Sequence, residues 1–272
     1  MKEAQAHAKI NLALVVGPQR SDGKHQVVTV LQRVNLADQI CLEPSARLKV
    51  HGFPGDTLVR NALKAIANRV GIAPSWAVRI EKRIPHAAGL GGGSSDAATA
   101  LRLANETLAQ PLGHTEMHKL AHALGADVPF FLREGPQLGR GDGAALSRLA
   151  LPQDYWVLLV LPTRAKKTST KAVYDAFDRR SGDRGFAERR ATLHSSLAEL
   201  ATSLDLAKLP LNDLASSPFA DELLALGAFR ADVSGAGPVV YGLFADRDGA
   251  EAARQAVAPL GQTWLTAPAW YG

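Results

Sequence analysis

Between Lys82 and Ala98 the chain reads Lys-Arg-Ile-Pro-His-Ala-Ala-Gly-Leu-Gly-Gly-Gly-Ser-Ser-Asp-Ala-Ala. The residues before it, 76–81, place an apolar side chain at every second position, which predicts a half-buried strand. The residues after it, through Ala104, are typical of a helix. Four glycines within five residues therefore connect a strand to a helix. The side chains that can cap this helix are Ser94, Ser95 and Asp96.

This glycine loop favours a phosphate site. Glycines let the backbone N–H groups approach a ligand closely, and a helix N-terminus attracts anions. The pattern Gly-x-x-x-x-Gly-Lys-Ser/Thr does not occur, which excludes a Walker loop, and the dinucleotide pattern would need glycine where Ser94 stands. The alternative is a flexible strand-to-helix connection. Because glycines, serines and an aspartate coincide at a helix start, we expect a nucleoside triphosphate to bind here.

Composition narrows the class of protein. At 272 residues with 46% hydrophobic side chains, the chain is expected to fold into two packed lobes. The net charge of +5 is partly local, in residues 164–167 and 179–190. Such runs usually form a solvated, charged surface. The alternative is that they attract a phosphorylated small substrate. Nucleic acid is disfavoured as a partner because no aromatic residues alternate with the basic ones.

The cysteine content and the hydropathy of the sequence indicate where in the cell the protein is expected. The single cysteine, Cys41, excludes an internal disulfide and a cysteine-based zinc site, and its apolar surroundings predict a buried, inert thiol. The first residues lack the apolar core of a signal peptide, and no apolar run approaches the roughly 18 residues of a membrane span. We therefore expect a soluble, cytoplasmic protein that does not enter membranes. Oligomeric state leaves no signature in the sequence.

Two polar positions stand out beside apolar strand and helix patterns. Residues 6–14 alternate, with Lys9 and Asn11 on the polar face, which is either a solvated surface or part of a site. Asp127 follows a helix stop at Gly125 and precedes an apolar segment. A helix or turn cap and a catalytic carboxylate are both consistent with that position.

The remaining patterns predict an α+β protein of two lobes, each a sheet covered mainly on one side by helices. Asp56 is expected to cap the helix over 58–70, and residues 178–186 are expected to form a charged surface loop. The other elements are strands over 27–34, 36–42, 155–161, 229–233, 239–244 and 263–266, and helices over 115–124, 170–177, 187–204, 223–226 and 249–257.

Three motifs together resemble those of the GHMP kinases: Ala8-Lys9-Ile10-Asn11-Leu12, the loop from Pro85 to Ala98, and Ser234-Gly235-Ala236-Gly237. The resemblance covers essentially the whole chain. It is strongest to the branch that phosphorylates a cytidine diphosphate alcohol in the non-mevalonate route to isoprenoids. The segments that carry this narrower resemblance are Ala8–Leu12, Arg20–His25, Gly89–Asp96, Leu124–Phe131 and Asn212–Leu214.

The resemblance implies a fold and a reaction. The fold would be an N-terminal ATP-binding α+β domain over residues 1–150 and a C-terminal ferredoxin-like domain over 151–272, with the site in the cleft between them. Asp127 would take the proton from the attacking hydroxyl, and Lys9 would keep that carboxylate ionised and polarise the hydroxyl. ATP and Mg²⁺ would be the cofactors, and Ser95 is the side chain that the resemblance offers as a metal ligand. The residues that would hold the ATP phosphates are Pro85, Ala88, Gly89, Leu90, Gly91, Gly92, Gly93, Ser94 and Ser95.

The partner implied is a small nucleotide-diphosphate substrate. His25 would read its cytosine, and Tyr174, four residues after Thr170, would stack on the base. Lys24 can lay its stem over a base or reach a phosphate. The substrate-binding residues expected from the resemblance are Asn11, Lys24, His25, Thr170 and Tyr174.

The chain departs from the family pattern at three positions. Lys24 replaces an aromatic residue before His25, which removes one face of the stack on cytosine. Thr57 replaces an asparagine that contacts adenine, and Asp142 replaces a glutamate.

Lys24 keeps open another GHMP kinase, of the homoserine or mevalonate type, although Asp127 within Leu124–Phe131 argues against it. The other rivals are a GHMP-fold binding protein without turnover and a nucleic-acid-binding protein. Retention of both Lys9 and Asp127 favours a kinase over a binding module.

Overall fold

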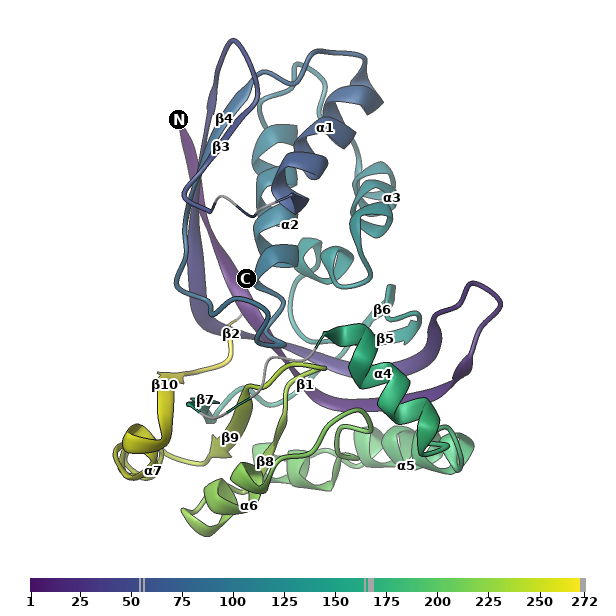
Figure 1. Cartoon of the computed structure of the whole chain (residues 1–272), viewed down its shortest axis with the longest axis vertical. Helices are drawn as coiled ribbons and strands as arrows, with labels where there is room; N and C mark the ends of the chain where they lie inside the picture. The colour runs from purple at the N-terminus through teal and green to yellow at the C-terminus, as the bar shows by residue number, and fades with distance from the viewer. Residues whose placement is uncertain (54, 56, 164, 166–168, 270–272) are drawn as a thin grey trace. The chain divides into compact units, whose positions relative to one another are not determined.

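The computed structural model describes residues 1–53, 55, 57–163, 165 and 169–269, which form two compact units (Figure 1). The first unit comprises residues 1–8, 36–86 and 91–134. The second comprises residues 9–35 and 87–90, together with the described residues from 135 on. Strands β1 (Lys2–Gln19) and β2 (His25–Pro44) contribute to both units. The boundary expected at residue 150 concerns family domains and stays a prediction.

The first unit packs helices on one side of a small sheet (Figure 1). Strand β3 (Lys49–His51) runs parallel to β4 (Trp76–Glu81), and β4 is antiparallel to residues 39–44 of β2. The apolar faces of α1 and α2 meet in the core, where Leu63, Ile66 and Leu101 are fully buried. The helices of this unit are α1 (Leu58–Val70), α2 (Gly92–Asn105), α3 (His114–Leu124) and the short 3-10 helix η1 (Val128–Leu132).

Helix α2 begins earlier than its side chains suggest. Its N-cap is Gly91, in the left-handed conformation with φ of 69°, and the expected caps Ser94, Ser95 and Asp96 all lie inside the helix. The expectation was wrong because a glycine in this conformation turns the chain into the helix without a capping side chain. The predicted cap of α1, Asp56, lies outside the described residues.

A buried ion cluster lies beside the start of α2. The ammonium of Lys82 contacts Oδ2 of Asp38 at 2.5 Å and Oδ2 of Asp96 at 2.7 Å. Oδ1 of Asp38 also accepts the backbone N–H groups of Arg83 and Ile84 at 2.6 and 2.8 Å. Oδ1 of Asp96 is buried and has no hydrogen-bond partner among the described residues. Asp38 therefore accepts more hydrogen bonds than Asp96, whose buried Oδ1 makes Asp96 the candidate for a neutral acid.

The pKa values of the cluster agree with this assignment. Burial, reinforced by the charge of Asp38, raises the pKa of Asp96 to about 8 against the opposing effect of Lys82. Burial alone would lower the pKa of Lys82, but Asp96 and Asp38 outweigh it and raise that pKa. Burial thus favours the neutral form of Asp96, although the ammonium of Lys82 lies beside it.

The second unit contains a long hairpin and a separate four-stranded sheet. In the hairpin part, β5 (Gln137–Gly141) pairs antiparallel with residues 27–31 of β2 and with β6 (Ala145–Arg148). The four-stranded sheet has the order β10-β7-β9-β8, and every neighbouring pair is antiparallel. Its strands are β7 (Trp156–Pro162), β8 (Arg230–Val233), β9 (Val240–Phe244) and β10 (Gly261–Thr266).

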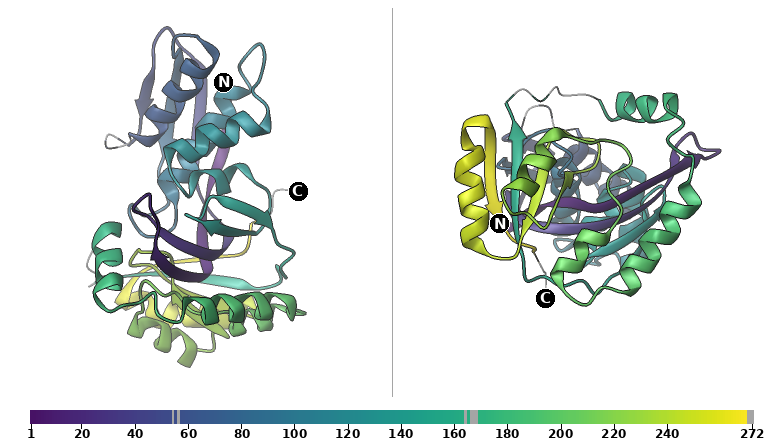
Figure 2. Two further views of the ribbon diagram at one scale, coloured as in Figure 1. Left: turned by 90° about the vertical axis from the view of Figure 1, so that its right-hand side faces the viewer. Right: turned by 90° about the horizontal axis from the view of Figure 1, so that it is seen from below.

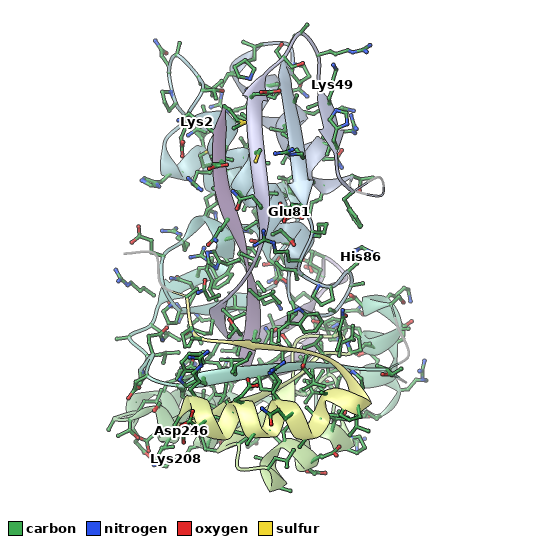
Figure 3. The ribbon with its side chains drawn as sticks, turned by 90° about the vertical axis from the view of Figure 1, so that its left-hand side faces the viewer. Lys2, Lys49, Glu81, His86, Lys208 and Asp246 are labelled. Carbon is green, nitrogen blue, oxygen red and sulfur yellow. The ribbon has the colours of Figure 1, made fainter. Side chains whose placement is uncertain are left out.

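Helices α6 (Pro218–Ala225) and α7 (Arg247–Val257) cover the same face of this sheet (Figure 2). Leu223 of α6 and Val257 of α7 share one core with Val160 and Val240 of the strands. Asp246, at the start of α7 in Figure 3, caps it by accepting the N–H of Gly249 at 2.8 Å. The strand order and the helices on one face make this sheet ferredoxin-like, as expected. Three further helices lie between β7 and α6: α4 (Thr170–Arg179), α5 (Phe186–Ala198) and the 3-10 helix η2 (Ser203–Lys208). The 3-10 helix η3 (Ala258–Leu260) lies between α7 and β10.

Several local expectations were wrong for identifiable reasons. The two strands expected on either side of Asn35 are one strand, because its N–H donates to the carbonyl of Ala267 at 2.9 Å. The helix expected over 187–204 ends at Ala198, because Thr202 and Asp205 form a capping box that starts η2. Cys41 is half-buried rather than buried.

A solvated surface at the basic run and the absence of a membrane span are both predicted, and the structure describes only part of the chain on which they depend. Residues 164, 166 and 167, which carry the basic run after β7, lie outside them. Within the described part of the chain, none of the helices combines the length and the apolar character that crossing a membrane requires.

Replacement of Asp96 by Asn is expected to stabilise the protein more as pH rises from about 4 to about 8. The pKa of Asp96 in the folded chain is about 8, against an ordinary value of 3.8, so the folded chain keeps a proton that the unfolded chain releases. The stability that this proton contributes is lost as pH increases through that window. Asparagine has no such proton, so the difference in unfolding free energy from wild type should grow by about 1 kcal/mol or more.

Denaturant unfolding at about pH 5, 7 and 9 measures this difference. Asp221→Asn removes an exposed carboxylate and serves as the control. A difference between Asp96→Asn and wild type that stays constant with pH would contradict the assignment of Asp96 as the buried acid.

Candidate active site

The polar face of β1 is buried, not solvated. Lys9 and Asn11 are each 4% exposed. The ammonium of Lys9 donates to Oδ1 of Asn11 at 2.6 Å, and the amide of Asn11 donates to Oγ1 of Thr29 at 2.8 Å. Thr29 in turn donates to the carbonyl of Ala13 at 2.8 Å. Since buried polar groups are costly unless hydrogen-bonded, this chain fixes the rotamers of Lys9 and Asn11.

The segment Ser234–Gly237 lies against these two side chains. Gly235 has φ of 58°, and a Cβ there would lie 3.3 Å from Oδ1 of Asn11 and 3.4 Å from Nζ of Lys9. The Lys9 backbone N–H donates to the carbonyl of Leu90 at 2.9 Å. The first and third motifs of the sequence therefore meet at Lys9.

The beginning of the glycine loop packs directly on the same segment. A Cβ at Gly89 (φ 83°) would lie 2.0 Å from the carbonyl oxygen of Ser234, and a Cβ at Gly237 would lie 2.2 Å from the nitrogen of Gly89. Ser234 Oγ donates to the carbonyl of Gly89 at 3.0 Å, and the N–H of Val239 donates to Ala88 at 3.3 Å. Only glycine fits at positions 89 and 237, because backbone occupies the space of a side chain.

The later part of the loop forms the N-terminus of α2 in the first unit. The first intrahelical bond runs from the N–H of Ser95 to the carbonyl of Gly91 at 2.9 Å. The preceding N–H groups, of Gly92, Gly93 and Ser94, therefore have no partner within the helix, and they can bind an anion. Gly93 is exposed, and a Cβ there would meet no atom of the described residues within 4 Å other than its chain neighbours and the nearby backbone of its own helix. Among the other loop residues, Ala88, Leu90 and Ser95 are buried, while Pro85 and Ser94 are half-buried.

His25 stands in a second cluster, formed with α4. It is buried, and its ring stacks on Tyr174 with centroids 4.9 Å apart and an interplanar angle of 29°. Phe177 meets the same ring edge-on at 5.8 Å, and Nε2 lies 2.8 Å from Oδ1 of Asp178. The structure thus brings His25 and Tyr174 together, and Thr170 begins the same helix one turn earlier.

Asp178 was expected in a surface loop and lies instead within α4. Its signal was its spacing: it follows Tyr174 by four residues, so both side chains share one helix face. The end of α4 could not be recognised from composition, because Asp178 begins a charged run of the kind that is typical of a surface loop.

Lys24 forms an ion pair. Its ammonium lies 2.8 Å from Oδ2 of Asp142, in the turn between β5 and β6, and its side chain is 53% exposed. The backbone N–H of Lys24 donates to Asp22 at 3.1 Å. Two of the three departures from the family pattern, at positions 24 and 142, therefore contact each other.

Asp127 occupies the N-cap position of η1 and is half-buried. Its side chain makes no capping hydrogen bond within the described part of the chain. Asp127 therefore occupies a cap position but does not cap the helix with its side chain. Asp127 belongs to the first unit and Lys9 to the second. Their pairing stays a prediction.

No group of three or more His, Cys, Asp or Glu side chains able to hold a metal ion occurs among the described residues.

Comparison with known proteins gives a consistent result. A model of the N-terminal domain of GHMP kinases matches residues 57–135, and a model of their C-terminal domain matches residues 186–260. The 4-diphosphocytidyl-2-C-methyl-D-erythritol kinase of Pelobacter propionicus is 37% identical over 97% of both chains. That of Chlorobium luteolum is 35% identical over 88% of this chain and 87% of its own.

Solved structures agree. A crystal structure of 4-(cytidine 5'-diphospho)-2C-methyl-D-erythritol kinase superposes over 100% of both chains with a TM-score of 0.80 and 30% identity. The mevalonate kinase of Methanococcus jannaschii superposes with a TM-score of 0.75 over 98% of both chains, and at 12% identity it shows the fold alone. Family models, full-length relatives and fold agree across both halves of the sequence, and the chain belongs to the GHMP kinase family.

Proposed function

We propose that this chain is an ATP-dependent kinase of 4-diphosphocytidyl-2-C-methyl-D-erythritol, which phosphorylates the 2-hydroxyl in the non-mevalonate synthesis of isoprenoid precursors. The observation that carries the proposal is the 37% identity to a relative of that name along 97% of both chains. The buried Lys9–Asn11 pair and the aromatic cluster at His25 lie in one compact unit, which suits a substrate with a reacting hydroxyl and a base. Because both of its substrates, ATP and a cytidine diphosphate alcohol, are nucleotides, we expect the enzyme to act in the cytoplasm.

The ATP phosphates would bind along the glycine loop. The N–H groups of Gly92, Gly93 and Ser94 at the start of α2 supply donors, and the helix dipole favours the negative charge. The backbone contact of Gly89 with Ser234 holds the beginning of the loop in shape before the nucleotide arrives. Mg²⁺ would neutralise charge on the transferred phosphoryl group, with Ser95 as the candidate protein ligand.

Lys9 and Asp127 would act on the acceptor hydroxyl. Phosphoryl transfer asks mainly for positioning and charge neutralisation, and Lys9 offers a fixed ammonium whose rotamer Asn11 sets. Asp127, at the N-cap position of η1, would accept the hydroxyl proton. The ammonium beside it would favour its ionised form.

The cytidine end of the substrate would occupy the surroundings of α4. His25 would read the base edge, and Tyr174 would offer its ring once it parts from the His25 ring. Asp178 holds Nε2 of His25 and so fixes the ring orientation. Thr170 and Asn11 would complete the contacts to the substrate.

Asp127→Asn is expected to lower kcat by about 10² to 10⁴ while ATP still binds, because the amide cannot accept the hydroxyl proton. The measurement is transfer of phosphoryl from ATP to 4-diphosphocytidyl-2-C-methyl-D-erythritol with Mg²⁺, alongside ATP affinity by calorimetry. Asp221→Asn, which removes an exposed carboxylate of α6, should behave as wild type. Wild-type kcat in Asp127→Asn would leave Asp127 with a structural role only.

Lys24→Tyr is expected to lower KM for the cytidine substrate about fivefold or more, since a stacked aromatic ring contributes about 1 to 3 kcal/mol. The value of kcat should change little because the base lies away from the transferred group. Lys24→Gln removes the ion pair with Asp142 without adding a ring, and is the control.

Both variants are best measured at two salt concentrations, because a phosphate contact by Lys24 would weaken with screening. A higher KM in Lys24→Tyr and in Lys24→Gln, larger at low salt, would show that the lysine itself binds the substrate.

A further inference from the structure

Asn212 is buried and fully hydrogen-bonded. Its amide nitrogen donates to the carbonyls of Val233 and Gly235 at 2.9 and 2.7 Å. Its Oδ1 accepts the N–H of Leu214 at 2.9 Å, and its own backbone N–H donates to Oδ2 of Asp232 at 2.8 Å. With 8% of the residue exposed, the three bonds of the side chain define one orientation of it, and the fourth bond fixes the backbone.

The same segment is attached to β1. Asn212 forms a parallel bridge with Leu14, and the N–H of Asp213 donates to the carbonyl of Leu14 at 2.9 Å. Oδ2 of Asp213 accepts the N–H of Val16 at 2.8 Å and the guanidinium of Arg189 at 2.9 Å. Strand β1, which carries Lys9 and Asn11, is thereby held along residues 14–16.

Gly235 is the point where this arrangement reaches the candidate site. Its carbonyl is held by Asn212, and the position of its Cβ would lie 3.4 Å from the ammonium of Lys9. A second brace acts on the backbone of Asn11, whose carbonyl accepts the hydroxyl of Tyr241 at 3.1 Å. The bond from Asn212 holds the carbonyl of Gly235, the residue of this segment that lies next to Lys9.

From this geometry we infer that Asn212 is a positioning residue for phosphoryl transfer. Its amide holds Gly235 against Lys9 and Asn11, and so fixes the ammonium that faces the acceptor hydroxyl. The inference rests on the proposed function of Lys9. Asn212 itself touches no reacting atom in this scheme, and acts through the Ser234–Gly237 segment.

Asn212→Asp is the sharpest test. The substitution keeps the shape of the side chain but replaces the donor that faces two carbonyl oxygens with a carboxylate oxygen, which those carbonyls repel. Gly235 should move, and kcat should fall about 10- to 100-fold, since displacements near 1 Å at a reacting group cost that much. The KM values for ATP and for the cytidine substrate should change by less than about threefold.

Asn105→Asp is the matched control. Asn105 is a half-buried amide of α2 that braces a backbone segment in the same way, with bonds of 3.0 and 2.7 Å to the carbonyl and N–H of Leu112. The Asn105→Asp variant should have a lower thermal unfolding midpoint than wild type and an unchanged kcat. Asn212→Ser, which is smaller and keeps one donor, should recover part of the lost kcat and replaces Asn212→Asp if that variant does not fold.

The outcomes separate the inference from the proposed function. Absence of turnover in the wild-type enzyme with the cytidine substrate would refute the proposed function. The positioning role is then still decided by a crystal structure of Asn212→Asp, in which an undisplaced Gly235 overturns it. In an active enzyme, kcat within twofold of wild type in folded Asn212 variants overturns it, as does a loss of activity that only follows the unfolded fraction.

Discussion

The backbone contact between Ala88–Gly89 and Gly237 is the constraint on which the site depends. A side chain at Gly237 would lie 2.2 Å from the nitrogen of Gly89, so the glycine loop and the Ser234–Gly237 segment come as close as two backbones can. Two segments more than a hundred residues apart in sequence are thereby held together beside Lys9. The glycines of these motifs serve packing as much as phosphate binding.

Local patterns predicted much of the fold. Alternation in residues 76–81 and helical spacing in α1, α3 and α7 gave the correct elements, since each follows from neighbours in the sequence. The ends of elements were less predictable: the start of α2 depends on the left-handed Gly91, and the continuity of β2 on a bond from Asn35 to Ala267. Both require knowledge of backbone conformation or of a distant partner.

The candidate site shows the same division. Lys9 and Asn11 could be placed on one strand face, but their burial depends on Thr29 and Gly235, which no local pattern connects to them. Alternation alone favours a solvated face for such residues. The ion pair of Lys24 with Asp142 is likewise a contact between distant turns, and it gives the lysine a partner inside the protein. Motif resemblance supplied the roles, and the structure supplied the contacts that make those roles physically reasonable.

Action on a cytidine diphosphate alcohol distinguishes the proposed kinase from other GHMP kinases, and a ratio of specificities measures it. The measurement is kcat/KM for 4-diphosphocytidyl-2-C-methyl-D-erythritol relative to homoserine and mevalonate, with saturating ATP and Mg²⁺. We expect a ratio above about 10³, because homoserine and mevalonate lack the cytosine that the groups around His25 would bind. Comparable values for the three acceptors, or preference for a free alcohol, would contradict it.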